Sequence, residues 1–314
     1  MDDAPSETAK AIGEGMQDFD LKEYLAERKQ WVEAAMEKCL PESAGLEKNV
    51  IDSMRYSLFA GGKRLRPILC LAAAEVVGGA WQTAMPSACA LEIIHTFSLI
   101  HDDLPAMDND DYRRGKLTNH KVYGEAMAIL AGDALLTEAF YIVANSRADL
   151  NIPPDRLLDA IVIISKAAGF RGMIAGQVID MESENRDVDI STVEYMHVHK
   201  TGALISASLE VGAILGGGSQ EQVAALKRYG RHLGLAFQIT DDLLDIEGDA
   251  ELMGKTPGSD IAKNKKTYPA LLGVPATREA AKTHVEGALE ALESFDEKAG
   301  PLRAIARYLL NRKA

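Results

Sequence analysis

The sequence is poor in the residues that stabilise small secreted proteins. It has 3 cysteines, Cys39, Cys70 and Cys89, and no CxxC pair, which disfavours a disulfide framework or a zinc site of paired cysteines. An odd number of scattered cysteines is typical of buried thiols in a reducing compartment. The first residues, MDDAPSETAK, lack the basic and apolar segments of a secretory signal. We therefore expect a cytoplasmic protein.

Positive charge is also scarce. The chain has 34 Lys and Arg against 47 Asp and Glu, and its net charge is −13. Proteins that bind nucleic acid gain most of their affinity from Lys and Arg on phosphates, and attraction to anionic lipid needs the same side chains. Nucleic acid is therefore not expected as a partner. An anionic substrate would need local basic clusters or bound cations.

Long hydrophobic runs are missing. An uncharged stretch covers residues 76–91, but Gly78, Gly79 and Pro86 interrupt it. It is shorter than the roughly 20 apolar residues that a membrane-spanning helix needs. No stable membrane insertion is expected.

Strand patterns are scarce, whereas helical patterns cover most of the chain. Hydrophobic residues make up 47% and aromatic residues only 6%, a composition that suits packed helices. Apolar spacing predicts an amphipathic helix from Leu21 to Cys39, stopped by Pro41. Further helices are predicted at 50–60, 67–77, 85–103, 124–145, 156–178, 192–215 and 221–246, and after Tyr268. With no linker or fixed repeat, the prediction is one all-α domain over 19–314 after a mobile tail, 1–18.

Two clusters of aspartates follow apolar helical runs. The first contains Asp102, Asp103 and Asp108, and the second contains Asp241 and Asp245, which are four apart and so share a helix face. Clustered carboxylates repel each other unless a cation neutralises them. Mg²⁺ typically takes one or two carboxylates and completes its shell with water and substrate phosphate. One solvated acidic helix end would be unremarkable, but two favour divalent cations.

A calcium-binding EF-hand is the alternative metal site. Its loop requires a glycine at the sixth position and a glutamate at the twelfth. Counted from Asp108, the glycine position is Arg113, and counted from Asp245 it is Ala250. Both registers fail, so an EF-hand is excluded.

Basic residues gather at two places that suit a diphosphate. In the segment 61–67, GGKRLRP, two glycines allow close approach of the backbone, and Lys and Arg can hold phosphate directly. It is not a P-loop. Arg113 and Arg114 follow the first aspartates, where they would either pair with acid or bind phosphate. His95 lies in an apolar run, which by itself is typical of a core histidine.

In this order, GGKRLRP, DDLPAMD with RRG, HKTG, FQITDDLLD and GKTPGSD with KTYPALLG resemble the trans-isoprenyl diphosphate synthases. This is the family of farnesyl and geranylgeranyl diphosphate synthases, and the resemblance covers the chain from Phe19 onward. It implies an all-α bundle of about ten or more helices around a central cavity, with both aspartate motifs facing it. It also implies a homodimer that uses Mg²⁺, three ions with bound diphosphate, to join an allylic diphosphate to isopentenyl diphosphate.

The resemblance assigns a role to each matching residue. It implies Mg²⁺ ligands at Asp102, Asp108 and Asp241, with Asp103 in an outer position and looser counterparts at Asp242 and Asp245. It implies that the allylic diphosphate is held by Arg113, Lys200 and Lys255. It implies that isopentenyl diphosphate is held by Lys63, Arg66, His95 and Arg114. Polar groups that steady the allylic cation match Thr201 and Gln238. Lys265 matches a loop lysine, and Gln177 and Asp180 match a pair near the metals.

Two other functions are weighed against this one. A class I terpene cyclase also ionises allylic diphosphates, but GGKRLRP and the second DDxxD motif disfavour it. An inactive partner subunit would have eroded aspartates, and both motifs are intact. We expect a fifteen-carbon product, since Phe97 lies about 7–8 Å before Asp102 along the helix and such an aromatic accompanies farnesyl products in the family. The alternative is a geranylgeranyl diphosphate synthase, because DNDDYRRGKLTNHKVYGE resembles such enzymes of photosynthetic lineages.

Overall fold

Helices form where the sequence repeats apolar residues with a helical period. The computed structural model describes residues 19–312 except 41, 43, 151, 185 and 248–265. Its longer helices are α2 (Leu21–Cys39), α3 (Lys48–Leu58), α4 (Leu65–Val76), α5 (Trp81–Asp102), α7 (Glu125–Asn145), α9 (Pro154–Ala168), α10 (Met173–Ser183), α11 (Ile190–His197), α12 (Ala203–Leu215), α13 (Gln220–Glu247), α17 (Val274–Glu290) and α18 (Gly300–Leu310). The predicted all-α class is confirmed.

Shorter elements join these helices. They are α6 (Asn119–Tyr123), α8 (Arg147–Leu150), α16 (Tyr268–Leu272), the π-helical turn η1 (Val198–Gly202), the 3₁₀ turn η2 (Glu297–Ala299), and strands β1 (Tyr112–Arg113) and β2 (Lys116–Leu117). The sequence patterns missed the antiparallel hairpin of β1 and β2. Its two turn residues, Arg114 and Gly115, both have positive φ, 52° and 76°, as the turns of two-residue hairpins require.

One predicted helix, 156–178, is wrong because the chain breaks it into α9 and α10. α9 ends at Ala168, and Gly169 to Gly172 turn the chain before α10 begins at Met173. A Cβ at Gly172 would overlap the carbonyl oxygen of Ala167. Only glycine therefore fits at position 172, although apolar residues recur with a helical period across the turn.

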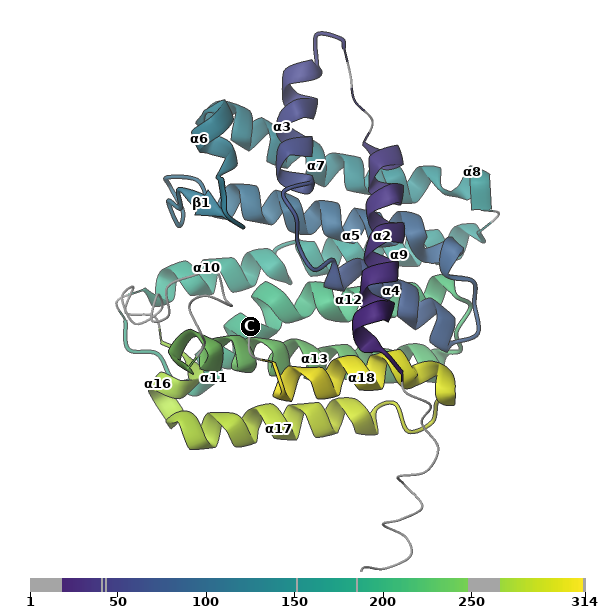
Figure 1. Cartoon of the computed structure of the whole chain (residues 1–314), viewed down its shortest axis with the longest axis vertical. Helices are drawn as coiled ribbons and strands as arrows, with labels where there is room; N and C mark the ends of the chain where they lie inside the picture. Colours follow the sequence, from purple (N-terminus) through teal and green to yellow (C-terminus); the bar gives the residue numbers. More distant parts are fainter. Residues whose placement is uncertain are drawn as a thin grey trace, which may run out of the picture.

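The core is centred on α5 and α12. α5 packs against α4 and α7, and α12 packs against α4, α9 and α13. Figure 1 shows most helices lying roughly parallel in a stack that α2 and α3 cross. One apolar cluster surrounds α5, and a second joins α12 and α13 to α17 and α18. This arrangement brings the ends of α5 and α13, with their aspartates, to the same part of the molecule.

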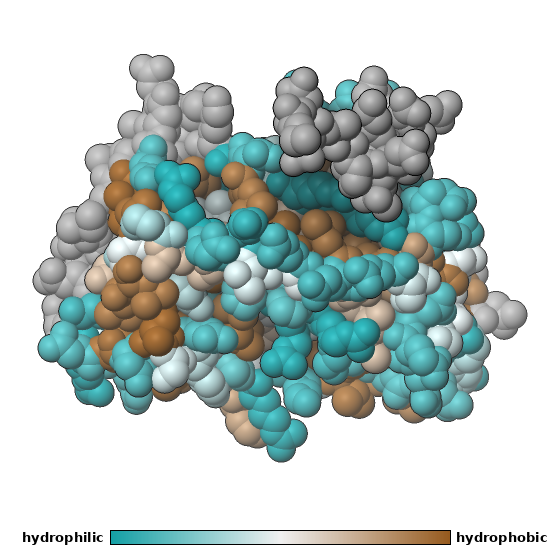
Figure 2. All heavy atoms as spheres, turned by 90° about the horizontal axis from the view of Figure 1, so that it is seen from below, coloured by the Kyte–Doolittle hydropathy of each residue, from teal (hydrophilic) through white to brown (hydrophobic). Residues whose placement is uncertain are grey.

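Two helices of the described chain, α5 and α7, are long and apolar enough to cross a membrane by length and composition alone. The apolar window of α5 is 67% buried, as expected of a core helix, whereas that of α7 is 33% buried. Ile129, Leu130 and Tyr141 of α7 are exposed. The face of the molecule in Figure 2 is largely hydrophilic, with separate hydrophobic patches.

Candidate active site

The first aspartate cluster lies where α5 ends and the chain turns back on itself. The amide of Asp108 donates to the carbonyl oxygen of Asp102 at 2.8 Å. This turn brings the two carboxylates close enough to interact. The pKa of Asp102 is raised to about 6, mainly by burial and further by Asp108, while Lys200 opposes the shift. A carboxylate in this position is stabilised by an added cation.

Asp103 is held by Arg113 of the β1–β2 hairpin. Its carboxylate accepts from Nε of Arg113 at 2.7 and 2.9 Å, and a terminal guanidinium nitrogen lies 2.6 Å from Oδ1. Burial raises the pKa of Asp103, and the hydrogen bond from Arg113 opposes that shift. The structure thus pairs Arg113 with Asp103. The carboxylate of Asp103 therefore binds another residue of the protein.

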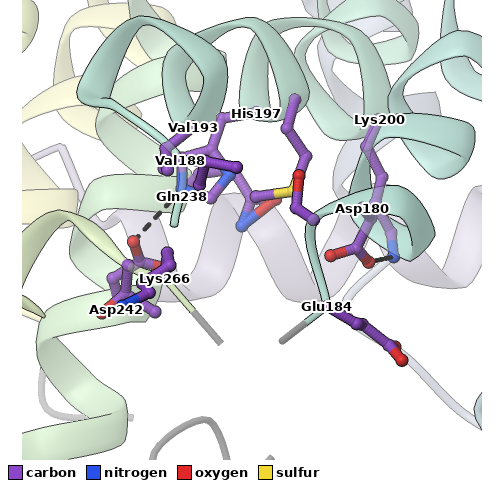
Figure 3. A pocket seen from close by; sticks show the side chains of 12 residues that line it. Asp180, Glu184, Val188, Val193, His197, Lys200, Gln238, Asp242 and Lys266 are labelled. Carbon is purple, nitrogen blue, oxygen red and sulfur yellow. Dashed lines mark hydrogen bonds and ion pairs between the residues drawn. The ribbon is translucent and has the colours of Figure 1, made fainter. Parts of the chain in front are cut away.

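In the second cluster, on α13, one aspartate is likewise buried and bound by other residues, and its neighbour is less buried. The carboxylate of Asp242 is buried and accepts from the backbone amide of Tyr268 at 3.0 Å, and it lies 3.1 Å from Nε2 of His197 (Figure 3). Asp241 is less buried and pairs with Arg312 at 2.6 Å. Sequence reasoning missed His197, Tyr268 and Arg312, which reach α13 from distant parts of the chain.

Between α10 and α13 the turn η1 carries Lys200 and Thr201. Nζ of Lys200 donates to Asp180 of α10 at 2.6 Å (Figure 3), and the hydroxyl of Thr201 donates to Oε1 of Gln238. A Cβ at Gly176 would overlap the backbone nitrogen of Lys200, so glycine lets α10 approach η1. Such π-helical turns occur frequently at functional sites.

These contacts border a cavity of about 140 Å³. Its lining combines charged and apolar side chains from α10, α11, η1 and α13 (Figure 3). The residues that it shares with the sequence prediction are Asp180, Lys200, Gln238 and Asp242. The cavity therefore lies beside the second aspartate cluster and contacts the turn that faces the first.

The basic residues predicted to hold isopentenyl diphosphate also come together. A guanidinium nitrogen of Arg114 donates to the carbonyl oxygen of Gly61. Arg66 lies near Arg114, and burial lowers the pKa of its guanidinium. The pKa of His95 is held well below its ordinary value by burial first and then by Arg66 and Arg114. His95 is therefore neutral at pH 7, within a cluster of cations.

Lys63 connects this basic pocket to the second aspartate cluster. Burial lowers its pKa first, Arg312 lowers it further, and Asp241 opposes the shift. Lys63 is thus within electrostatic reach of Asp241. Of the other predicted residues, Lys255 and Lys265 lie outside the described part of the chain. Gln177 is on α10, where its Nε2 is buried without a hydrogen-bond partner among the described residues.

The side chains at this site suit Mg²⁺ better than a metal ion that is coordinated by protein side chains alone. In the described residues, no group of three or more His, Cys, Asp or Glu side chains is arranged to hold a metal. Mg²⁺ does not need one, since it binds through one or two carboxylates together with water and substrate phosphates. The half-buried, mutually repelling carboxylates of Asp102 and Asp108 suit that chemistry.

Comparisons with known proteins agree with one another. The sequence model of a family described as polyprenyl synthetase matches residues 47–304. A dimethylallyltranstransferase of Fischerella ambigua is 53% identical over 94% of this chain and 84% of its own. A geranylgeranyl diphosphate synthase of Cyanophora paradoxa is 49% identical over 94% of this chain and 97% of its own.

Solved structures show the same likeness. The geranylgeranyl pyrophosphate synthetase of Pyrococcus horikoshii superposes with a TM-score of 0.85 and 33% identity, covering 94% of this chain and 100% of that one. An FPP/GFPP synthase of Zymomonas mobilis gives a TM-score of 0.82 and 37% identity, covering 93% of this chain and 99% of that one.

Proposed function

Because this chain belongs to the polyprenyl synthetase family and is a short-chain prenyltransferase, we propose that it condenses an allylic diphosphate with isopentenyl diphosphate in a Mg²⁺-dependent reaction. The favoured product is the fifteen-carbon farnesyl diphosphate. Dimethylallyl and geranyl diphosphate are the proposed allylic substrates.

The proposal rests on one observation: the aspartates at the ends of α5 and α13 lie near basic side chains in one region of the molecule. Asp102 interacts with Lys200, and Asp241 interacts with Lys63. Two anionic substrates need cations from the protein, while metal ions need carboxylates. A site with both kinds of group can hold two diphosphates in different ways, one through metal and one through direct contacts.

The residues divide the chemistry between them. Mg²⁺, when bound by Asp102, Asp108 and Asp241, stabilises the negative charge of the leaving diphosphate. Lys200 and Arg113 add positive charge to the same group, since preorganised cations act where charge develops. The oxygens of Thr201 and Gln238 face the carbocation, and the apolar side chains around α5 keep water from it.

The reaction needs no side-chain base. The allylic C–O bond breaks, and its electron pair leaves with the diphosphate. The double bond of isopentenyl diphosphate supplies the pair for the new C–C bond. A proton is then lost to the departing diphosphate, which restores neutrality. Meanwhile Lys63, Arg66 and Arg114 hold the second diphosphate, and His95 contacts it as a neutral imidazole.

Phe97 supports a fifteen-carbon product. Its ring, only 8% exposed, lies in the core around α5 and packs edge-on against His101 with 5.1 Å between ring centroids. A rigid ring one to two turns before Asp102 limits the room for a growing chain. A twenty-carbon product is the second candidate, because several relatives are named geranylgeranyl diphosphate synthases.

Product analysis tests both proposals. The purified protein is incubated with Mg²⁺, dimethylallyl diphosphate and isopentenyl diphosphate, and product mass is read. We expect mainly fifteen-carbon diphosphate, and longer products from Phe97→Ala. Phe295→Ala is the control, because Phe295 is equally buried in the other apolar cluster. Mainly twenty-carbon product from the wild type would refute the favoured length, and a cyclised hydrocarbon would refute the reaction.

We also propose that two copies of the chain pair through α7 and α9, which pack on each other. Leu130 of α7 and Leu158 and Val162 of α9 are 56%, 60% and 61% exposed, and burying them in a dimer removes apolar surface from water. Light scattering should find a dimer that Leu130→Glu weakens. Leu272→Glu, at an exposed leucine of α16, should leave it intact. A monomeric wild type would refute this proposal.

A further inference from the structure

One cation of the basic segment is more deeply buried than its neighbours. Arg64 is 2% exposed and pairs with Glu92 of α5, also 2% exposed, at 2.9 Å. Its other terminal nitrogen donates to the carbonyl oxygen of Leu58 at 2.7 Å. Lys63 and Arg66, on either side of it, remain more accessible. The segment therefore uses Arg64 to attach itself to the core.

The backbone at Arg64 is as constrained as its side chain. It adopts φ 53° and ψ 35°, the left-handed region, immediately before α4. A non-glycine residue stays in that conformation only when its surroundings fix it. Nε of Arg64 also lies 3.5 Å from Glu33 of α2. Contacts to α2, to the end of α3 and to α5 thus fix the direction in which the chain enters α4.

Glu92 also acts on cations that it does not pair with. It opposes the burial that lowers the pKa of Arg66 and of Arg114. It lies three residues before His95, on the same side of α5. In the described part of the chain, neither Arg66 nor Arg114 forms an ion pair with a carboxylate, and Glu92 pairs with Arg64 instead. The negative charge of Glu92 thus reduces the repulsion between Arg66 and Arg114. It does so without forming an ion pair with either of these two side chains, which are predicted to bind the substrate.

We propose that Arg64 and Glu92 are positioning residues for isopentenyl diphosphate. The proposal rests on the proposed function and extends it to two buried side chains that the chemistry does not use. The pair sets the turn that presents Lys63 and Arg66, and its carboxylate lets Arg66 and Arg114 lie close together. Neither member needs to touch the substrate.

Stability alone does not require an ion pair here. Apolar residues of similar volume often replace a buried ion pair without loss of stability. The double variant Arg64→Met/Glu92→Met therefore separates the two roles. If the pair positions cations, the double variant folds but binds isopentenyl diphosphate poorly. If the pair only fills space, binding is unchanged.

The test is a calorimetric titration with isopentenyl diphosphate alone in Mg²⁺-free buffer, where no reaction occurs. We expect the double variant to bind about tenfold more weakly, as when one charged contact is misplaced. Its melting temperature and its KM for the allylic diphosphate should stay near those of the wild type. Arg28→Met/Glu75→Met is the control, since it removes another ion pair of 2.9 Å, between α2 and α4, and should bind normally.

The outcomes are distinct. Wild-type affinity in the folded double variant overturns the proposal, as does an equal loss for both substrates. If the double variant does not fold, Glu92→Gln, which keeps the shape and removes the charge, decides in the same titration: weaker binding supports the proposal and unchanged binding refutes it. Titration with inorganic pyrophosphate separates the failures. If the wild type makes no prenyl product yet the variants bind pyrophosphate more weakly, only the proposed function fails.

Discussion

The two aspartate pairs are alike in form but are completed in different ways. In both, the second carboxylate is buried and held by the protein, Asp103 by Arg113 and Asp242 by His197. Arg113 follows Asp103 by 10 residues, on a hairpin formed nearby. His197 precedes Asp242 by 45 residues and reaches it through helix packing. The end of α5 is therefore organised locally, and the end of α13 by tertiary structure.

The first carboxylates, Asp102 and Asp241, have a different environment from the second. Each interacts with a cation across the site, Lys200 for Asp102 and Arg312 for Asp241. Partners that orient the residues beside a metal ligand often matter nearly as much as the ligand itself. We therefore propose that in each pair the first carboxylate binds the metal and the second, held by the protein, helps to orient it.

The largest expected effect is on turnover. Asp102→Ala and Asp241→Ala should each reduce kcat by about 10²–10³-fold or more, the loss typical of removing one charge-stabilising group. The fold should remain intact by circular dichroism. Chelation by EDTA should abolish wild-type activity, and excess Mg²⁺ should restore it. Asp155→Ala, in the first turn of α9, is the control. Full activity in chelator would contradict a role through metal.

The next effect is on stability and separates the two pairs. Asp242→Asn should lower the free energy of unfolding by about 1–3 kcal/mol, because it disturbs the buried hydrogen bonds that the carboxylate forms with His197 and with the amide of Tyr268. Its side chain and that of His197 are each 8% exposed. Asp103→Asn should cost less, because the side chain of Arg113 is 32% exposed and solvent screens the interaction. Urea unfolding of both variants measures the difference, and a larger loss for Asp103→Asn would reverse the comparison.

Sequence reasoning succeeded where the partners are close in the chain. The neighbouring aspartates and arginines at 102–114 already posed the choice between pairing and phosphate binding, and helical periodicity located α2, α5 and α13. It missed His197 and Arg312 because nothing local marks a residue that reaches α13 from 45 or 71 positions away. It also missed the break at Gly169, since apolar spacing says nothing of backbone overlap.

A smaller effect concerns Arg312, the cation beside Asp241. Arg312 pairs with Asp241 at 2.6 Å and would compete with a metal ion for that carboxylate, so Arg312→Gln should strengthen Mg²⁺ binding by no more than about fivefold, in line with a partly exposed ion pair. The measurement is the rise in melting temperature with Mg²⁺ concentration. Arg278→Gln, which removes an exposed pair with Glu247, should not change it. Weaker Mg²⁺ binding in Arg312→Gln would show that Arg312 supports the metal.

We propose that Asp102 and Asp241 bind the metal, whereas the carboxylates of Asp103 and Asp242 are held by other residues of the protein. This proposal is tested most directly by calorimetric titration of Mg²⁺, with pyrophosphate present, into the four single Asp→Asn variants at a temperature where all are folded. Asp102→Asn and Asp241→Asn should bind Mg²⁺ much more weakly than the wild type, whereas Asp103→Asn and Asp242→Asn should bind it nearly as well. Equal losses in all four, or larger losses in the second members, would contradict it.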